Sequence, residues 1–365
     1  MSEARPYERA TRPDEALLTR GLLKHHAAVT RASTVIDFAA RPNQGIELGN
    51  QSASQNATES PARVVLASYN IRYAVGSQLI SSGLLRKAGY NFPRQRSEAV
   101  ARNIQAAARV FSEGELLPRP DIIALQEADK ETGRAGGQHV AAQLADQLKL
   151  PYVHVGAGIP RGVQPEQREW WLNFEEQIAL HDEGDTGVAL LSRLPISEVT
   201  RVDLPWHDCP WRPRLAMGIT FELGGRRVRL FNVHIDPHGP LDNQHQQTEV
   251  VLEHAARHDG PSIILGDFNT LSKQKAVAIR ALMESRGYST PLPTGTATWR
   301  GAGLRFHADW VFVKGVSVSR WGVVRPLKVS DHWPIWAEVS TECRPQRHRD
   351  AEKKEGMDRR GATRC

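Results

Sequence analysis

Short apolar runs that end in a polar side chain recur through the middle of this 365-residue chain. The run at residues 263–265 predicts a buried strand that ends at Gly266. Asp267 and Asn269 follow where the chain leaves the sheet, and in an extended chain both would point to one face. Gly, Asp and Asn also favour turns for local reasons, so this motif alone indicates a turn as readily as a site.

Strand patterns alternate with helix patterns from residue 63 onward. The expected strands lie at 64–71, 121–127, 151–155, 187–192, near 199, 214–222, 226–235, 263–265, 308–313 and 333–339. The expected helices lie at 95–111, 139–148, 243–258 and 273–286. Gly224-Gly225 predicts a hairpin turn between two of the strands. Strands that are interspersed with helices, some of them joined by hairpins, predict an α/β (α+β) domain with mixed sheets.

The polar residues at the strand ends form a chemically coherent set. They are Asn70, Glu127, His234, Asp267 with Asn269, Asp309, and Asp331 with His332. A single Asp or His at a strand end usually caps a helix, forms a turn or packs against its neighbours. Polar side chains at the ends of so many strands indicate instead that they meet at one rim, where open α/β sheets bind ligands. Oxygen ligands without a thiolate suit Mg²⁺ or Mn²⁺, and the histidines supply groups that titrate near neutrality.

Composition narrows the possibilities further. No apolar run approaches the ~20 residues of a membrane-spanning helix, and the N-terminus has no apolar signal region, so a cytoplasmic location is expected. Three distant cysteines fit neither a disulfide framework nor a zinc pattern. Of the net charge of +6, half lies in residues 341–365, so the remainder shows no strong nucleic-acid footprint by charge alone.

Three regions are expected. Residues 1–62 form an N-terminal extension and linker, with a short amphipathic helix within 13–32, and residues 63–340 form the folded domain that carries the polar strand ends. Residues 341–365 are expected to be a charged, disordered tail. We expect a monomer.

Six motifs in order resemble the endonuclease/exonuclease/phosphatase superfamily of deoxyribonuclease-I-like folds. They are Ser68-Tyr69-Asn70-Ile71, Leu125-Gln126-Glu127, Asn232-Val233-His234, Gly266-Asp267-Phe268-Asn269, Asp309-Trp310-Val311 and Ser330-Asp331-His332. The resemblance implies a four-layered sandwich in which two mixed, largely antiparallel β-sheets pack face to face with helices on the outer faces. It also implies a Mg²⁺-dependent hydrolase that cleaves phosphoester bonds by in-line attack of an activated water.

The resemblance assigns a metal site to three of these residues. Glu127 would be the principal ligand, Asn70 would help to hold the metal or the scissile phosphate, and Asp331 would add a carboxylate. The metal would neutralise charge on the phosphate.

The resemblance assigns catalytic roles to the others. Asp267 would position and deprotonate the attacking water, and Asn269 would hydrogen-bond the phosphoryl oxygens. His332, oriented by Asp309, would stabilise the transition state, and His234 would lie on the leaving-group side. Either Asp267 or His332 can take the proton on this reading.

The substrate is left open between a nucleic acid, a phospholipid headgroup and a small phosphoester. Asp129 stands where abasic-site endonucleases of the superfamily carry lysine, which places this chain outside that subgroup. Trp170, Trp171 and Arg214 are candidates for substrate contact, and the acidic loop 156–186 disfavours a duplex. Asp236 would share a strand face with His234 and either orient it or contact substrate.

Three rival readings remain. A zinc site formed by His234, Asp236 and His238 would need a helix, which Pro237 opposes. A serine hydrolase would need a Gly-x-Ser-x-Gly elbow, which is missing from the sequence. A catalytically silent binding module would be expected to have lost one of the catalytic side chains.

Overall fold

The computed structural model describes residues 45–49, 60–77, 93–158, 178, 182–205, 213–301, 303–325 and 327–342. The helix expected within 13–32, Trp170, Trp171 and most of the charged tail lie outside these residues. The proposed division into three regions therefore stays a prediction.

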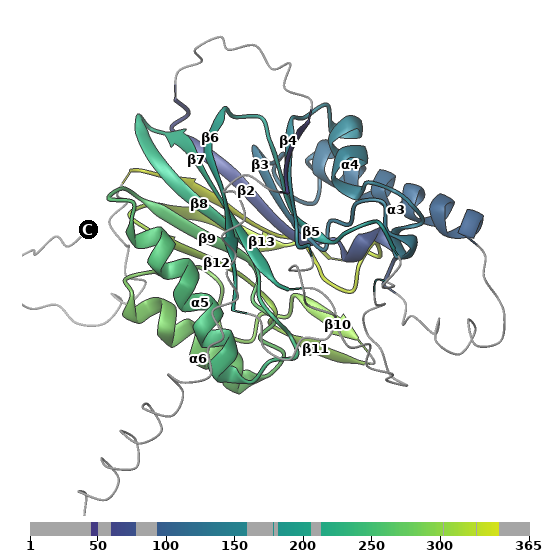
Figure 1. Ribbon diagram of the computed structural model, residues 1–365. Coiled ribbons are helices and arrows are strands. Elements are labelled where there is room, and N and C mark those ends of the chain that lie inside the picture. The colour runs from purple at the N-terminus through teal and green to yellow at the C-terminus, as the bar shows by residue number, and fades with distance from the viewer. Residues whose placement is uncertain are drawn as a thin grey trace, which may run out of the picture. The chain divides into compact units, whose positions relative to one another are not determined.

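Two β-sheets carry the architecture (Figure 1). The seven-stranded sheet has the order β1 (Ile46–Gly49), β4 (Tyr152–Gly156), β5 (Gly187–Ser192), β3 (Ile122–Gln126), β2 (Arg63–Asn70), β14 (Ile335–Ser340) and β13 (Ser317–Val323). The five-stranded sheet has the order β12 (Asp309–Lys314), β9 (Ser262–Asp267), β8 (Arg226–His234), β7 (Leu215–Leu223) and β6 (Ile196–Asp203). A short hairpin, β10 (Trp299–Gly301) and β11 (Leu304–Phe306), stands apart from both.

Three apolar layers hold the sheets and helices together. One layer, which includes Leu66, Ile219 and Leu265, fills the space between the two sheets. The other two lie beneath the helices, α3 (Pro93–Glu113) and α4 (Val140–Leu148) on the seven-stranded sheet and α5 (Leu241–Ala256) and α6 (Lys273–Ser285) on the five-stranded sheet. The four-layered sandwich expected from the sequence is therefore confirmed.

Strand direction gathers the polar strand ends at one rim. β2 runs parallel to β3, and β8 runs parallel to β9, so each pair ends at the same edge of its sheet. β12 and β14 run the other way and begin at that rim, since Asp309 pairs with Asp267 and Ile335 pairs with Ser68. The convergence predicted from the sequence follows from this topology.

A buried polar link joins the two sheets just below the rim. Gln126 Nε2 donates to Asn232 Oδ1 at 2.6 Å, across the interface between β3 and β8. Asn232 Nδ2 donates in turn to the carbonyl oxygens of Leu125 and Ala189, each at 2.9 Å. Because Gln126 and Asn232 are both fully buried, these bonds fix one sheet against the other.

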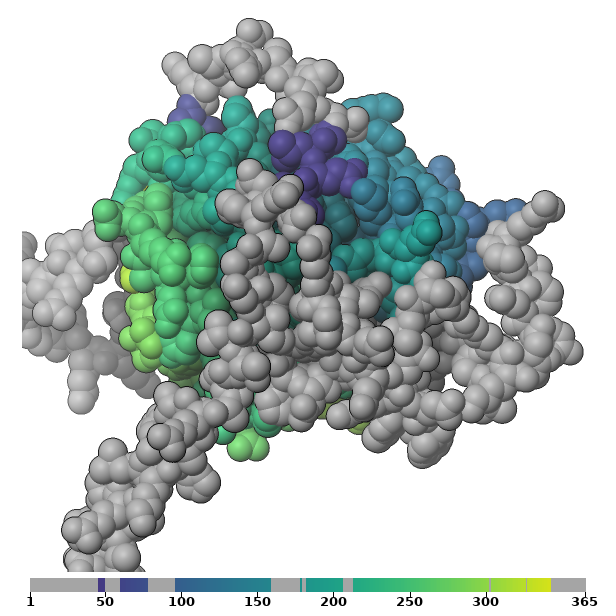
Figure 2. Space-filling view, viewed as in Figure 1, coloured from purple at the N-terminus to yellow at the C-terminus, as the bar shows by residue number. Residues whose placement is uncertain are grey.

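The sequence-based assignment of residues 1–62 to an extension and linker does not hold for residues 46–49. These residues form β1, an edge strand paired with β4 and visible at the surface in Figure 2 (purple). A four-residue strand between polar segments gives too short a pattern to identify. Side chains also fix it, because Glu47 accepts hydrogen bonds from Lys130 Nζ at 2.6 Å and from the Tyr152 hydroxyl at 2.8 Å.

The remaining elements agree with expectation to within a few residues, with two omissions. The strand β13 and the hairpin β10–β11 were not predicted. Gly224 and Gly225 have φ values of 56° and 71°, as the expected hairpin turn between β7 and β8 requires. Among the described residues, no helix is both long and apolar enough to cross a membrane.

Candidate active site

The Gly266-Asp267-Phe268-Asn269 segment is both a turn and part of the polar cluster. Gly266 has a φ of 141°, and a Cβ there would lie 2.1 Å from the carbonyl oxygen of Val233, so only glycine fits. Asn269 adopts a left-handed φ of 50°, and its backbone N–H donates to Asp267 Oδ1 at 2.8 Å. The chain is therefore not extended here, and its turn geometry is what fixes the carboxylate.

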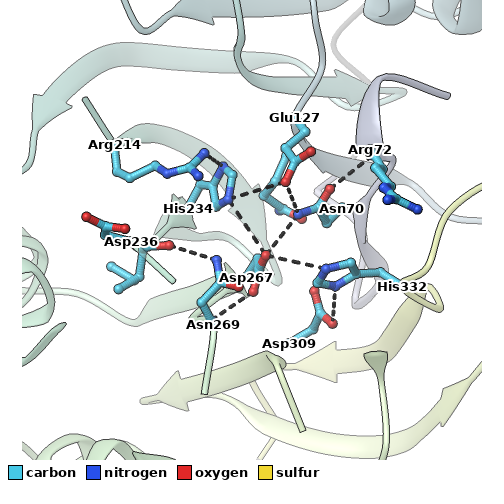
Figure 3. A network of polar contacts seen from close by, with 12 residues as sticks. Asn70, Arg72, Glu127, Arg214, His234, Asp236, Asp267, Asn269, Asp309 and His332 are labelled. Carbon is cyan, nitrogen blue, oxygen red and sulfur yellow. Dashed lines mark hydrogen bonds and ion pairs between the residues drawn. The ribbon is translucent and has the colours of Figure 1, made fainter. Parts of the chain in front are cut away.

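The Asp267 carboxylate lies at the centre of the cluster (Figure 3). Its Oδ2 accepts a hydrogen bond from Asn70 Nδ2 at 2.9 Å. The same oxygen lies 3.7 Å from His234 Nε2 and 3.8 Å from His332 Nε2. Asp267 is fully buried, and this burial raises its pKa to about 7, although the positive charge of His332 acts in the opposite direction.

The side-chain amide nitrogen of Asn70 donates hydrogen bonds to two carboxylates. Its Nδ2 donates to Glu127 Oε1 at 3.0 Å as well as to Asp267. Its Oδ1 accepts the backbone N–H of Arg72 at 3.0 Å, which fixes the orientation of the amide. Its amide nitrogen thus faces the acidic groups, and its expected role of helping to hold a metal or the scissile phosphate stays a prediction.

His332 is hydrogen-bonded to Asp309, the pairing that the family resemblance implies. His332 Nδ1 lies 2.9 Å from Asp309 Oδ2, so Nε2 is the ring nitrogen that faces Asp267. Burial alone would lower the pKa of His332, but the negative charges of Asp309 and Asp267 raise it to about 10. The ring is therefore an imidazolium at neutral pH, placed beside a buried carboxylate.

His234 is flanked by a cation. Arg214 Nη1 lies 3.3 Å from His234 Nδ1, and Arg214 is only 4% exposed. A guanidinium has no lone pair to accept a hydrogen bond, so Nδ1 is the acceptor and Nε2 carries the proton. That proton faces Glu127 and Asp267, whose nearest oxygens lie 3.8 and 3.7 Å away.

Asp236 does not serve as the orienting partner of His234. Its carboxylate points away from the histidine in Figure 3, and its Oδ1 accepts the backbone N–H of His238 at 2.8 Å. Residues 237–239 form a bend, and none of residues 236–239 is helical. The geometry that a zinc site at His234, Asp236 and His238 requires is thus missing.

Asp331 is engaged by two side chains that the sequence analysis missed. Trp299 Nε1 donates to Asp331 Oδ2 at 3.1 Å, and Arg72 Nη1 lies 3.6 Å from the same oxygen. Burial acts to lower the pKa of Arg72, but the negative charge of Asp331, with a smaller contribution from Glu127, acts to raise it, and the pKa is raised overall. The guanidinium therefore stays charged within reach of both acidic groups.

The backbone beside these groups is strained. Arg72, Tyr73 and Ala74 have φ values of 47°, 39° and 55°, and Glu127 has a φ of 49°. Left-handed conformations cost L-residues roughly 1–2 kcal/mol each, and such strain is concentrated at functional sites. The position of Arg72, two residues after Asn70, was the only sequence signal for its role.

A buried ion pair supports the strained turn. Asp129 bonds Arg134 Nε at 2.6 Å, and the Arg134 guanidinium lies 4.1 Å from the centre of the Tyr73 ring. Asp129, the residue that replaces the lysine of abasic-site enzymes, is thus a structural partner of Arg134 and is fully buried.

The donor set fits a hard divalent cation. Glu127, Asp267, Asp309 and Asp331 are four buried carboxylates, and no cysteine is present in the described residues. One atom each of Asp267, Asp309 and His332 lies within 4.8 Å of the others. Mg²⁺ binds through one or two carboxylates and keeps several waters, which this oxygen-rich rim accommodates.

Comparison with known sequences identifies one family. Residues 67–332 match the model of the "Endonuclease/Exonuclease/phosphatase family". A UPF0294 protein of Yersinia enterocolitica is 29% identical over 115 residues, covering 31% of this chain and 43% of that protein. A UPF0294 protein of Photorhabdus laumondii is 28% identical over 141 residues, covering 36% of this chain and 53% of that protein. The chain thus spans about half the length of these curated relatives.

Comparison with solved structures agrees on the fold. An endonuclease/exonuclease/phosphatase family protein from Leptotrichia buccalis is 16% identical, with a TM-score of 0.52 over 76% of this chain and 99% of that one. A protein of the same description from Bacteroides thetaiotaomicron is 19% identical, with a TM-score of 0.51 over 80% of this chain and 99% of that one. At these identities, the likeness shows a shared fold alone.

Proposed function

Since the chain belongs to the Endonuclease/Exonuclease/phosphatase family, we propose that it is a metal-dependent hydrolase that cleaves phosphoester bonds by in-line attack of water. The nucleases and phosphatases in the family's name cleave such bonds. The substrate class follows from the family, whereas the metal requirement and the residue roles below rest on the geometry of the site.

The single observation that carries the proposal is the position of Asp267 Oδ2. One buried oxygen lies within 3.8 Å of His234 Nε2 and His332 Nε2, and 2.9 Å from Asn70 Nδ2. A carboxylate with a pKa raised to about 7 is a competent base near neutral pH. Asp267 would orient the attacking water and accept its proton.

His332 would stabilise the charge that develops on the phosphoryl oxygens. Its imidazolium is fixed by Asp309 at 2.9 Å, so no reorientation is needed when the negative charge builds up. Because His332 is already protonated at neutral pH, this geometry favours Asp267 as the base.

Glu127 would hold the metal, with Asp331 as a further carboxylate beside it. Asn70 fixes Glu127 by the 3.0 Å bond to Oε1, and Arg72 lies next to Asp331 at 3.6 Å. Bound Mg²⁺ or Mn²⁺ would supply a Lewis acid that neutralises phosphate charge. We infer that Asn70 and Arg72 position these carboxylates.

His234 and Asn269 would complete the site. His234 Nε2 lies 3.7 Å from Asp267 Oδ2 and 3.8 Å from Glu127 Oε1, and its N–H would donate a hydrogen bond to the leaving oxygen. Asn269 Nδ2 donates one hydrogen to the carbonyl oxygen of Ile235 at 2.8 Å, so its second Nδ2 hydrogen is the donor that would reach a phosphoryl oxygen. Arg214 would act through His234.

The test is a panel of phosphodiesters and phosphomonoesters assayed with Mg²⁺, with Mn²⁺ and with EDTA. Asp267→Asn should lower kcat by about 10²–10⁴, because it removes the proposed base. His332→Gln should lower kcat by about 10²–10³, because it removes a fixed charge at the transition state. Glu222→Gln, an exposed carboxylate on β7, is the matched control and should leave kcat unchanged.

The panel also separates the rival reading. A silent binding module would hydrolyse no substrate with any metal and would bind phosphoesters equally well after Asp267→Asn. Full activity in EDTA, or in the Asp267→Asn variant, would overturn the proposal.

A further inference from the structure

The hairpin β10–β11 places like charges opposite each other beside the catalytic rim. Arg300 and Arg305 are direct cross-strand partners, flanked by the Trp299–Phe306 pair. Like charges directly opposite on an antiparallel pair are destabilising, so a chain gains no stability from this arrangement. Arg305 is exposed and Arg300 is half-buried, so solvent or a ligand reaches both.

A third arginine joins them from the loop that precedes the Ser330-Asp331-His332 motif. Arg325 is exposed, and its guanidinium lies 4.7 Å from the centre of the Trp333 ring. Partial burial lowers the pKa of Arg325, and the nearby positive charge of Arg305 lowers it as well. Arg300 lies over the same ring at 5.4 Å. Both guanidinium groups thus lie within 5.4 Å of the centre of one aromatic ring.

No carboxylate neutralises this cluster in the part of the chain that the structure describes. None of the three arginines lies within 4 Å of the side chain of a described Asp or Glu, and their hydrogen bonds run to backbone carbonyls, from Arg300 to Leu327 and from Arg325 to Ala297. Most other half-buried or buried arginines near the rim are engaged by partners, as Arg72 is by Asp331. An arginine cluster without acidic partners is a common signature of an anion-binding surface.

The cluster is coupled rigidly to the catalytic residues. The backbone N–H of Arg300 donates to the carbonyl oxygen of Asp331 at 2.9 Å, and Trp299 forms a β-bridge with His332. The arginines thus begin next to His332 and lead away from it along the hairpin, which β10 and β11 form at one end of the sheets in Figure 1. An anion held there would belong to the same substrate as the phosphate beside His332.

We propose that Arg300, Arg305 and Arg325 form a second phosphate-binding site, which takes a phosphate that neighbours the scissile one in a single-stranded nucleic acid. This inference rests on the proposed function, because it deepens the substrate class of the same site. Guanidinium groups contact phosphates, and the half-buried Phe306 ring, stacked on the Trp299 ring at 5.5 Å between centroids, adds an aromatic surface beside them. A phosphomonoester or a small diester has no second phosphate to place there.

The surface around the three arginines favours a single-stranded nucleic acid over a lipid bilayer as the binding partner. The large hydrophobic side chains exposed in the described residues are Leu48, Leu116, Val277, Leu304 and Trp321, of which only Leu304 belongs to the hairpin. Membrane-surface binding needs a face of clustered apolar side chains beside the cations. One leucine does not supply it.

The first experiment measures binding without catalysis. A fluorescein-labelled, twelve-nucleotide single strand is titrated with the full chain in EDTA, and its anisotropy is followed at several salt concentrations. The double variant Arg305→Gln/Arg325→Gln should weaken binding about tenfold. It should also reduce the salt slope by about 0.7 for each lost contact. Arg226→Gln, an exposed arginine at the far end of β8, is the charge control and should change neither.

The second experiment separates this inference from the proposed function. With Mg²⁺, the double variant should raise KM for the oligonucleotide and leave kcat/KM for bis(p-nitrophenyl) phosphate unchanged. Arg305→Lys/Arg325→Lys should restore most of the salt slope, which shows that charge rather than fold was lost. A wild-type chain that hydrolyses no phosphoester would overturn the proposed function, whereas the anisotropy result still decides the arginine site.

Two outcomes overturn the arginine site. One is equal oligonucleotide binding by the wild type and the double variant. The other is arginine-dependent binding to phosphatidylserine vesicles with no binding of the oligonucleotide, which would assign the cluster to a membrane surface. Thermal melting of each variant confirms that the chain is folded.

Discussion

Asn70 Nδ2 lies 2.9 Å from Asp267 Oδ2, although β2 and β9 belong to different sheets and 197 positions separate the two residues. The same amide nitrogen bonds Glu127, so one NH₂ group bridges two acidic side chains. The NH₂ group thus lies between the carboxylates of Glu127 and Asp267 and reduces their mutual repulsion.

Replacing this amide with a carboxylate should destabilise the fold in a pH-dependent way. In Asn70→Asp, the new carboxylate faces Glu127 and Asp267, so its pKa in the folded state lies above its unfolded value. The free energy of unfolding should decrease by about 2–4 kcal/mol as pH rises through that pKa, and at low pH the variant should lose little stability. Urea unfolding in EDTA at pH 5 and pH 8 checks the sign, and equal losses at both would contradict it.

Removing Asp309 should act on activity through His332. In Asp309→Asn, the largest cause that raises the pKa of His332 is lost, so that pKa should fall from about 10 toward neutrality. We expect kcat to drop by roughly 10²-fold, since the ring loses its fixed charge. Nitrogen-15 NMR titration of the His332 ring measures the pKa, and an unchanged value would show that Asp309 is not its partner.

His154 should make the domain sensitive to mild acid. It is almost fully buried, and its Nε2 lies 2.8 Å from the carbonyl oxygen of Ala128. Burial, helped by the charge of His139, lowers its pKa from 6.5 to about 4. As pH falls, His154 is therefore protonated in the unfolded chain before it is protonated in the folded one. The free energy of unfolding that the neutral His154 contributes is lost as pH falls from 6.5 to about 4.

The size of this effect can be measured by substitution. Between pH 7 and pH 5 this one group should remove about 2 kcal/mol of unfolding free energy. His154→Gln keeps a donor for the Ala128 carbonyl oxygen but does not titrate, so its stability should fall by that much less over the same range. Parallel pH profiles for the wild type and the variant would refute the assignment.

The Gln126–Asn232 link should show strong coupling. Asn232→Leu leaves Gln126 Nε2 and two backbone carbonyls with fewer partners, and we expect a loss of about 1–3 kcal/mol. Adding Gln126→Leu removes the orphaned amide, so the double variant should lose less than the sum of the single losses. A double-mutant cycle by urea unfolding measures this, and strict additivity would show that the two amides act independently.

Much of the site was predictable because strand ends carry their chemistry in the sequence. Asp309, His332 and Asp267 follow or precede apolar runs, and sheet topology alone brings them together. The local sequence could not reveal that Asn269 would be left-handed, which makes the Asp267 segment a turn and a site at once.

Other features depend on contacts that no local pattern encodes. Arg72 enters the site through three consecutive left-handed residues, a conformation that no residue type at 72–74 signals. β1 is too short to show alternation and depends on Glu47 reaching Lys130 and Tyr152. Asp236 looked equivalent to His234 by spacing, but the bend at 237–239 turned it away.

The place of β14 ties the site to the order in which the chain is made. β14, the last of the described strands, lies between β2 and β13, and His332 stands three residues before its first residue. A polypeptide emerging from the ribosome can pair β2 with β3, but it holds no imidazolium opposite Asp267 until the final residues of the domain are released. Asp331 and His332 are therefore the last side chains to join the cluster, and a chain that stops before residue 331 lacks both.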